Sequence, residues 1–118
     1  MPRIHHVNLG VPPELVDAES QFLVDVLGYR VAELPPEVEA FGALWFDADD
    51  GTQVHLSRDP EHAPARQAHT ALVVGDELDG IQERLEGAGT KYKATEGLGN
   101  RVILCRDPAG NRWELRSS

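Results

Sequence analysis

Short runs of alternating hydrophobic and polar residues recur along the chain, and two pairs of these runs match each other. Residues 6–11 read His-Val-Asn-Leu-Gly-Val and residues 69–74 read His-Thr-Ala-Leu-Val-Val. Residues 51–56, Gly-Thr-Gln-Val-His-Leu, match residues 110–115, Gly-Asn-Arg-Trp-Glu-Leu. The offsets are 63 residues (6 to 69) and 59 residues (55 to 114), and loops easily absorb the difference. The pattern therefore predicts two copies of one structural unit.

Within the first copy, the pattern predicts a strand, a helix and three further strands. Residues 4–11 are typical of a strand, and residues 14–27 carry apolar side chains near helical spacing. Pro12 and Pro13 are expected at the start of the helix, and Gly28 is expected to end it in a left-handed conformation. The other strands are expected at residues 29–34, 43–47 and 53–56.

The second copy repeats this order after a polar, proline-bearing segment. The elements expected there are a strand at 69–74, a helix at about 77–86 and strands near 91–95, 101–105 and 111–116. A chain of 118 residues is too short for two independent cores. We therefore expect an α+β fold with two tandem βαβββ modules in a single domain, residues 1–118. The expected parts are module 1 at about 1–58, a linker at about 59–68 and module 2 at about 69–118.

Composition and charge narrow the functional classes. The chain is 41% hydrophobic and 26% charged, which is typical of a globular protein. Its formal net charge of -9 disfavours nucleic acid and anionic membranes as partners, because both recruit Lys and Arg. It has neither an apolar run of roughly 20 residues nor a secretory signal, so we expect a cytoplasmic protein. The single cysteine, Cys105, is expected to be a small buried residue.

Four residues of metal-binding type occupy matching positions in the two copies: His6 with His69, and His55 with Glu114. Because side chains alternate across a strand, all four are predicted on the sheet face away from the helices. They would converge if the modules pair their sheets about a pseudo-twofold axis. Three imidazoles and one carboxylate suit one divalent transition metal ion, namely zinc, iron, nickel, manganese or cobalt, rather than calcium or magnesium. Without a thiolate ligand, the site is expected to keep a position open for water or substrate.

Other polar residues share the predicted metal face. Asn8, Gln53 and Arg112 are predicted to contact the substrate, and arginine is the natural partner of a carboxylate or a phosphate. Ser57 and Arg116 have the same strand parity.

Two further histidines are expected to lie elsewhere, since His5 has the opposite parity and His62 falls in the polar linker. His62 is expected to be solvated. Trp45 and Phe41 are expected either to line the pocket or to pack in the core.

These residues resemble the vicinal-oxygen-chelate superfamily, which includes glyoxalase I, methylmalonyl-CoA epimerase, fosfomycin-resistance proteins, extradiol dioxygenases and bleomycin-resistance proteins. The resemblance covers nearly the whole chain, and its most specific part is residues 106–115. The other matching segments are residues 6–11, 22–29 and 69–74. It implies paired βαβββ modules that form an open, cupped sheet around the metal, often in a homodimer. His6, His69 and Glu114 fall on recurrent ligand positions of the family. His55 departs from the Glu or Gln found at its position in glyoxalase I-like enzymes and epimerases.

The family's chemistry implies a small-molecule substrate that chelates the metal through vicinal oxygens. A glyoxalase-like lyase or isomerase is the first reading, with Glu114 or a metal-bound hydroxide removing a proton beside a carbonyl. An extradiol-type dioxygenase is the second, using His6, His69 and Glu114 as an iron(II) triad. A fosfomycin-type thiol transferase is the third. A non-enzymatic, bleomycin-resistance-type drug-binding protein stays open as another class, because the acidic chain suits a cationic drug, although the full ligand set counts against it.

Overall fold

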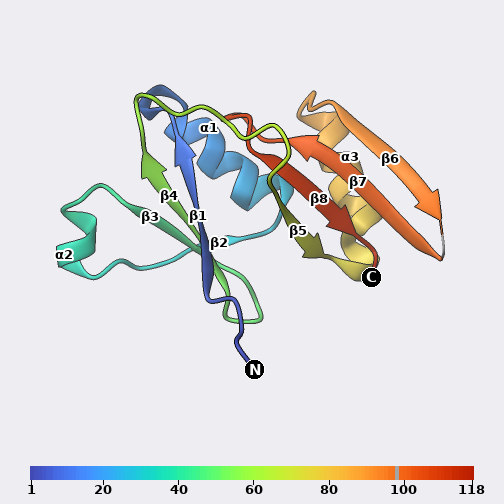
Figure 1. The fold of residues 1–118 in the computed structure, drawn as a ribbon, viewed down its shortest axis with the longest axis horizontal. Coiled ribbons are helices and arrows are strands. Elements are labelled where there is room, and N and C mark those ends of the chain that lie inside the picture. The colour runs from blue at the N-terminus through green and yellow to red at the C-terminus, as the bar shows by residue number, and fades with distance from the viewer. Residues whose placement is uncertain (98) are drawn as a thin grey trace. The chain divides into compact units, whose positions relative to one another are not determined.

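The computed structural model describes residues 1–97 and 99–118, and the chain divides into two compact units, Met1–Ala63 and Pro64–Ser118. Each unit holds one four-stranded sheet and one principal helical segment, in the chain order β-α-β-β-β (Figure 1). The α+β fold of two βαβββ modules predicted from the repeats is therefore confirmed. Within the described part of the chain, no helix combines the length and apolar character needed to cross a membrane.

The first unit has the strand order β1-β4-β3-β2. Strand β1 pairs in parallel with β4, and the other neighbours are antiparallel. Its elements are β1 (His6–Val11), a 3-10 turn (Pro13–Leu15), α1 (Val16–Gln21), a π-helical turn (Phe22–Val26), β2 (Arg30–Val31), α2 (Pro36–Glu39), β3 (Leu44–Asp47) and β4 (Gln53–Arg58).

The helical segment of the first unit has the predicted ends. It begins directly after Pro12, with Pro13 at its first position, where the missing N–H costs nothing. Gly28 follows it with φ of 87°, the left-handed conformation that glycine adopts without strain. Two predictions for the next segment were wrong. Strand β2 is limited to Arg30–Val31, and the short helix α2 was not expected.

The second unit repeats this topology, with the order β5-β8-β7-β6 and a parallel β5–β8 pair. Its elements are β5 (His69–Val73), a 3-10 turn (Gly75–Glu77), α3 (Leu78–Gly87), β6 (Tyr92–Gly97), β7 (Asn100–Arg106) and β8 (Arg112–Arg116). The four strands and the helix α3 were predicted to within three residues at their ends, and the 3-10 turn was not predicted.

Each unit buries one apolar face of its sheet. The buried strand residues of the first unit are Val11, Phe46, Val54 and Leu56, and those of the second are Ile103, Cys105, Trp113 and Leu115. In the second unit, the indole Nε1 of Trp113 donates a hydrogen bond to the buried carboxylate of Asp107 at 2.9 Å. Burial, with a smaller contribution from Asp107, raises the pKa of the Cys105 thiol to about 12. The thiol is therefore an unreactive core group, as expected.

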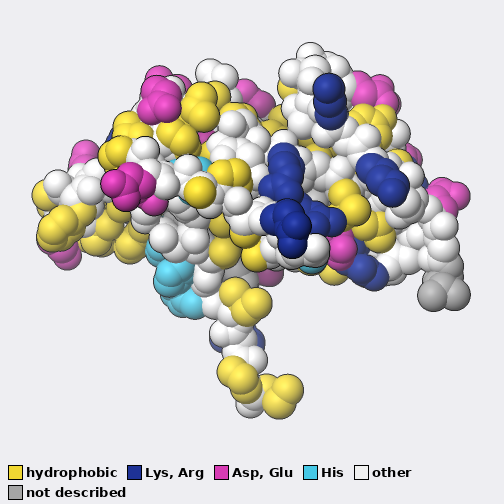
Figure 2. All heavy atoms as spheres, turned by 45° about the horizontal axis from the view of Figure 1, so that its top comes forward, with side chains coloured by type: hydrophobic (Ala, Val, Ile, Leu, Met, Phe, Trp, Pro, Cys, Tyr) yellow, Lys and Arg dark blue, Asp and Glu magenta, His cyan; other side chains and the backbone are white. Residues whose placement is uncertain are grey.

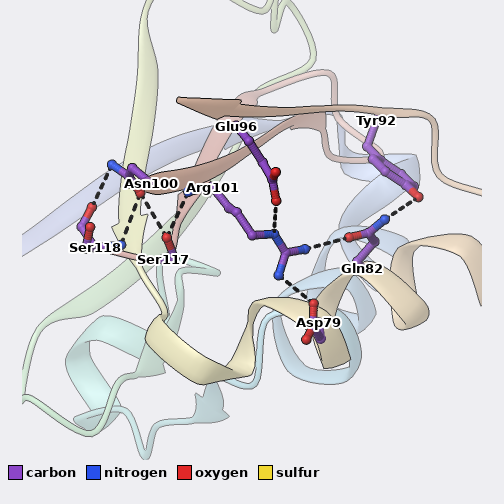
Figure 3. A network of polar contacts seen from close by, with 8 residues as sticks. All are labelled: Asp79, Gln82, Tyr92, Glu96, Asn100, Arg101, Ser117 and Ser118. Atoms are coloured by element: carbon purple, nitrogen blue, oxygen red, sulfur yellow. Dashed lines mark hydrogen bonds and ion pairs between the residues drawn. The ribbon is translucent and has the colours of Figure 1, made fainter. Parts of the chain in front are cut away.

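A polar network fixes α3 to the sheet of the second unit (Figure 3). The guanidinium of Arg101 on β7 donates to Asp79 at 2.6 Å and to Gln82 at 3.1 Å, both on α3, and lies 3.6 Å from Glu96 on β6. Gln82 also donates to the hydroxyl of Tyr92 at 2.9 Å. The helix therefore covers the Arg101 side of this sheet, and the opposite face carries His69 and Glu114.

Candidate metal site

In the first unit, two predicted metal ligands lie in contact. The parallel register places Asn8 opposite His55 and His6 opposite Gln53, so the two histidines are diagonal neighbours on one sheet face. Their rings stack with centroids 3.9 Å apart and an interplanar angle of 13°. His55 is 9% exposed, whereas His6 is exposed.

An aromatic column extends this pair on both sides. The indole of Trp45, which lies opposite His55 on β3, stacks on the other side of the His55 ring at a centroid distance of 4.4 Å. The ring of His5 meets His6 edge-on at 5.2 Å, and the two Nδ1 atoms are 3.0 Å apart. Figure 2 shows histidine side chains gathered where the N-terminal residues leave the body of the molecule. The side chain of His55 is therefore held in place from both faces of its ring.

Hydrogen bonds orient His55 and favour its neutral form. Gln53 donates from Nε2 to Asp47 at 2.7 Å, which turns its Oε1 toward His55 Nε2 at 2.8 Å. His55 then donates through Nε2, and its Nδ1 carries the lone pair. Burial, followed by repulsion from His6 and His5, lowers the pKa of His55 to about 4. A neutral imidazole is the form that binds metals.

In the second unit, the other two predicted ligands face each other. His69 Nε2 lies 3.8 Å from Glu114 Oε1. Nδ1 of His69 donates to the backbone oxygen of Gln67 at 2.9 Å, so in the neutral ring Nε2 carries the lone pair. Arg116 Nη1 donates to the other carboxylate oxygen, Glu114 Oε2, at 3.1 Å. His69 Nε2 and Glu114 Oε1 thus face each other, while the other ring nitrogen and the other carboxylate oxygen are held by hydrogen bonds.

The residue types of both pairs suit a divalent transition metal ion. Only the His69–Glu114 pair is spaced for one ion as it stands, because the stacked rings of His6 and His55 direct their in-plane lone pairs along nearly parallel planes. Two atoms that share one ion at about 2 Å lie about 3 to 3.4 Å apart, close to the 3.8 Å between His69 Nε2 and Glu114 Oε1. In both His55 and His69, one ring nitrogen donates a hydrogen bond that orients the ring, and the other carries the lone pair. This arrangement is usual for histidines that bind metals. No group of three or more His, Cys, Asp or Glu side chains suited to a metal occurs among the described residues. Within each unit the predicted ligands occur as a pair.

The predicted substrate contacts have different surroundings. Asn8 accepts a hydrogen bond from Ser57 Oγ at 2.8 Å through Oδ1, and its Nδ2 has no partner among the described residues. Both ends of the Gln53 amide are engaged by Asp47 and His55. Arg112 lines a cavity over the sheet of the second unit.

The placement of His5 and His62 differs from prediction. His5 was assigned to the helix face, but β1 begins at His6, so the alternation does not extend to His5, and its ring contacts His6. His62 is half-buried rather than solvated, because its ring covers Gly10, where a Cβ would lie only 2.6 Å from Nδ1. Trp45 stacks on His55, while Phe41 is 89% exposed and belongs to no core.

Sequence reasoning missed a basic cavity of about 550 Å³ in the second unit. It is lined by Lys91, Tyr92, Lys93, Leu104, Cys105, Arg106 and Arg112. The signal in the sequence is the pair of lysines two residues apart, which a strand would place on the same face.

The structure is that of a small two-module protein with a duplicated βαβββ topology, and each copy carries a pair of side chains of metal-ligand type at equivalent strand positions. A model of the Glyoxalase/Bleomycin resistance protein/Dioxygenase superfamily matches residues 3–115. The chain belongs to this superfamily, which confirms the resemblance seen in the sequence. No curated protein matches the chain at a significant level.

Solved structures share the fold over nearly the whole chain. A protein assigned to the glyoxalase family from Bacillus anthracis is 23% identical with a TM-score of 0.85, and the match covers 98% of this chain and 94% of that one. A glyoxalase/dioxygenase from Nostoc punctiforme is 23% identical with a TM-score of 0.80, covering 97% and 89%. A mutant of the fosfomycin resistance protein FosX from Listeria monocytogenes, solved with Mn(II) and 1S,2S-dihydroxypropylphosphonic acid, is 18% identical with a TM-score of 0.79, covering 100% and 94%. At these identities the similarity concerns the fold.

Proposed function

We propose that the chain is a metal-dependent lyase or isomerase of the glyoxalase type, with one divalent transition ion held by His6, His55, His69 and Glu114. The observation that carries this proposal is the occurrence of two pairs of metal-binding side-chain types at equivalent strand positions of two repeated modules. The Mn(II) in the FosX mutant structure supports a divalent ion. When bound, the ion would act as a Lewis acid toward a small molecule chelated through two vicinal oxygens.

Glu114 is the residue that we assign as the catalytic base. Its Oε2 is held by Arg116 Nη1 at 3.1 Å, while Oε1 is directed toward His69 and carries no hydrogen bond to a described residue. In the proposed reaction, a Glu114 carboxylate oxygen that is not engaged with the ion at that step accepts the proton from the carbon beside the substrate carbonyl and returns it during isomerisation. The side-chain exposure of Glu114 is 21%, so its carboxylate is partly shielded from water yet open on one side.

The other polar residues of the first unit have separate tasks. Asn8 offers its Nδ2 to a substrate oxygen, because its Oδ1 already accepts from Ser57. Gln53 is a positioning residue rather than a substrate contact, since Asp47 and His55 occupy both ends of its amide. Trp45 forms an apolar wall against His55.

An iron(II) dioxygenase is the second candidate, and the hydrogen bonding of His55 favours it. His55 Nε2 is committed to Gln53, so only Nδ1, on a ring stacked between Trp45 and His6, can reach an ion. If His55 does not bind, then His6, His69 and Glu114 form the set of two histidines and one carboxylate used by iron(II) oxygenases. A fosfomycin-type thiol transferase and a drug-binding protein without catalysis are the remaining alternatives.

We further propose that the protein works as a cytoplasmic homodimer. Each four-stranded sheet ends in two edge strands, β1 and β2 in the first unit and β5 and β6 in the second. Natural proteins cover or pair such edges, and a twofold dimer is the commonest way to do so between identical chains. Sedimentation across a dilution series, with and without chelator, measures the assembly and its dependence on metal.

The test of the reaction uses protein loaded with zinc, iron(II), nickel, manganese or cobalt. Hemithioacetals, α-keto acids and catechols are offered in D2O, and NMR follows deuterium incorporation and product formation. Glu114→Gln should lower turnover by about 10²- to 10⁴-fold, the usual worth of a general base. Glu83→Gln, which changes an exposed carboxylate on α3, should leave turnover unchanged. Oxygen consumption with catechols would instead indicate the dioxygenase, and equal activity of the two variants would exclude Glu114 as the base.

A further inference from the structure

The basic cavity of the second unit concentrates positive charge in an acidic protein. Four of its lining residues are cationic, namely Lys91, Lys93, Arg106 and Arg112, and both lysines of the chain are among them. The whole chain has only 11 Lys and Arg against 20 Asp and Glu. Because like charges repel, gathering these four cations on one surface destabilises the folded chain unless negative charge compensates for it.

The register of the sheet shows where this basic cavity lies. Lys93 pairs with Leu104 and Leu104 with Glu114, which makes one row across β6, β7 and β8. In the adjacent row, Arg106 pairs with Arg112, and Arg112 with His69. This register places Lys93, Arg106 and Arg112 on the same sheet face as the His69–Glu114 pair. Neighbouring strands lie about 4.8 Å apart, so Arg112 is one strand from His69, while Arg106 is two strands, or about 10 Å, from His69 and Lys93 is equally far from Glu114.

The cations of the cavity lack the acidic partners that Arg30 and Arg101 have. Arg30 and Arg101 are paired with Asp49 and Asp79 at 2.5 and 2.6 Å. By contrast, the side chains of Lys91, Lys93 and Arg112 form no hydrogen bond or ion pair within residues 1–97 and 99–118.

Arg106 is held differently, because its guanidinium donates to three backbone carbonyls, those of Ala65, Gly110 and Arg66, at 2.8 to 3.1 Å. These bonds fix the guanidinium without neutralising its charge. The fold therefore positions a cluster of positive charge and leaves its neutralisation to a ligand.

We propose that this cavity binds a doubly charged oxyanion group, such as a phosphate, on a small organic molecule. A single carboxylate would leave the three partnerless cations with excess positive charge, whereas a dianion with several acceptor oxygens can meet both the lysines and the arginine fork. A volume of about 550 Å³ exceeds the need of a free inorganic ion, and Leu104 supplies an apolar floor for an organic part. An extended polyanion is disfavoured by the chain's net charge of -9.

The cavity adjoins the donor pair of the second unit, so the bound molecule is also a suitable substrate. This last step rests on the proposed function, because it requires the same molecule to reach the metal. Anion binding itself does not require the metal. The cations would then select substrates by their anionic end while Glu114 acts on the other end.

The test measures binding to chelator-treated, metal-free protein by NMR titration with inorganic phosphate, methyl phosphate and acetate at equal ionic strength. We expect both phosphates to shift resonances of β6, β7 and β8, methyl phosphate at least as tightly as inorganic phosphate, and acetate about tenfold more weakly. Lys93→Gln and Arg112→Gln should each raise the phosphate Kd about tenfold. Arg3→Gln removes the same charge from the exposed N-terminal segment and should leave the Kd unchanged.

Three results would overturn this proposal: equal effects of Arg3→Gln and Arg112→Gln, acetate binding as tightly as phosphate, or methyl phosphate binding much more weakly than inorganic phosphate. Phosphate binding in a protein that never takes up metal would uphold the anion site and reject the proposed function. A protein that takes up metal but binds phosphate in neither its metal-free nor its metal-loaded form would reject the anion site and leave the proposed function standing.

Discussion

The two donor pairs occupy equivalent positions in the repeated modules, yet their surroundings differ in nearly every physical respect. His55 of the first pair is buried between two rings and hydrogen-bonded to a neutral amide. In the second pair, His69 and Glu114 have side-chain exposures of 37% and 21%, and the carboxylate is held by Arg116. The first pair is aromatic and stacked, and the second is polar, open and beside a cluster of cations.

Under the proposed function, in which both pairs serve one ion, this contrast assigns different work to the two modules. The common β-α-β-β-β scaffold keeps four strand positions fixed, while the neighbours of each position are free to change. Burial in the first unit favours the neutral form of His55. The openness of the second unit suits the proposed base Glu114 and the proposed anion-binding cavity, because both must be reached by a substrate. Variants of the residues that contact each pair can therefore test the metal-binding role of the first pair and the proposed base and anion-binding roles of the second unit separately.

The largest expected effect is on metal affinity, when the residue that orients each pair through a hydrogen bond is removed. Gln53→Ala removes the hydrogen-bond partner of His55, and Arg116→Ala removes that of Glu114. Loss of such a partner typically weakens metal binding about 10- to 100-fold, and we expect this from both variants. Competitive titration with a metal-binding dye measures the change.

The two orienting variants also report on His55 itself. If Gln53→Ala leaves the metal affinity unchanged while Arg116→Ala lowers it, His55 is not a ligand and the three-residue set of the dioxygenase reading is favoured. Ser57→Ala, which removes a hydrogen bond to Asn8 on the same face of the first unit, is the matched control and should keep the wild-type affinity.

A smaller effect is expected in the pH dependence of stability. The pKa of His55 is lowered from 6.5 to about 4 in the folded chain. As the pH falls from 6.5 toward 4, the unfolded chain takes up a proton at this residue and the folded chain does not, so the free energy of unfolding decreases. His55→Phe keeps a ring between His6 and Trp45 and removes this contribution.

Urea unfolding of the metal-free protein between pH 4 and 8 measures the difference between His55→Phe and the wild type. Comparison of the two proteins cancels the titration of the carboxylates that they share. The wild type should lose more stability than the variant on acidification, and parallel pH profiles would show that His55 is not held neutral by its surroundings.

Most of the fold could be predicted because the repeats and the strand periodicity carry information locally. Gly28, for example, marks the end of a helix by chemistry that needs no tertiary context. The short helix Pro36–Glu39 was missed because its sequence, rich in proline and glutamate, has no apolar periodicity. The short β2 reflects pairing with β3 at only Arg30 and Val31, which depends on the sheet and not on the segment itself.

The sequence was enough to predict which residues of the candidate site share a sheet face, but not which side chains surround them. Strand parity was enough to place His6 with His55 on one face and His69 with Glu114 on another. The stacking of Trp45 on His55 depends on the register between β3 and β4, which a single sequence does not reveal. The basic cavity likewise requires three strands in register, so only Arg112 among its cations was singled out.

Whether both donor pairs serve one ion is tested most directly by counting metal ions per chain in four proteins: the wild type, His6→Ala, His69→Ala and the double variant. Each is reconstituted with zinc, dialysed, and measured by elemental analysis against protein concentration. If the pairs share one ion, the wild type should hold close to one ion per chain, each single variant should lose most of it, and the double variant should lose no more. Two ions in the wild type, or a full ion retained by either single variant, would contradict a shared site.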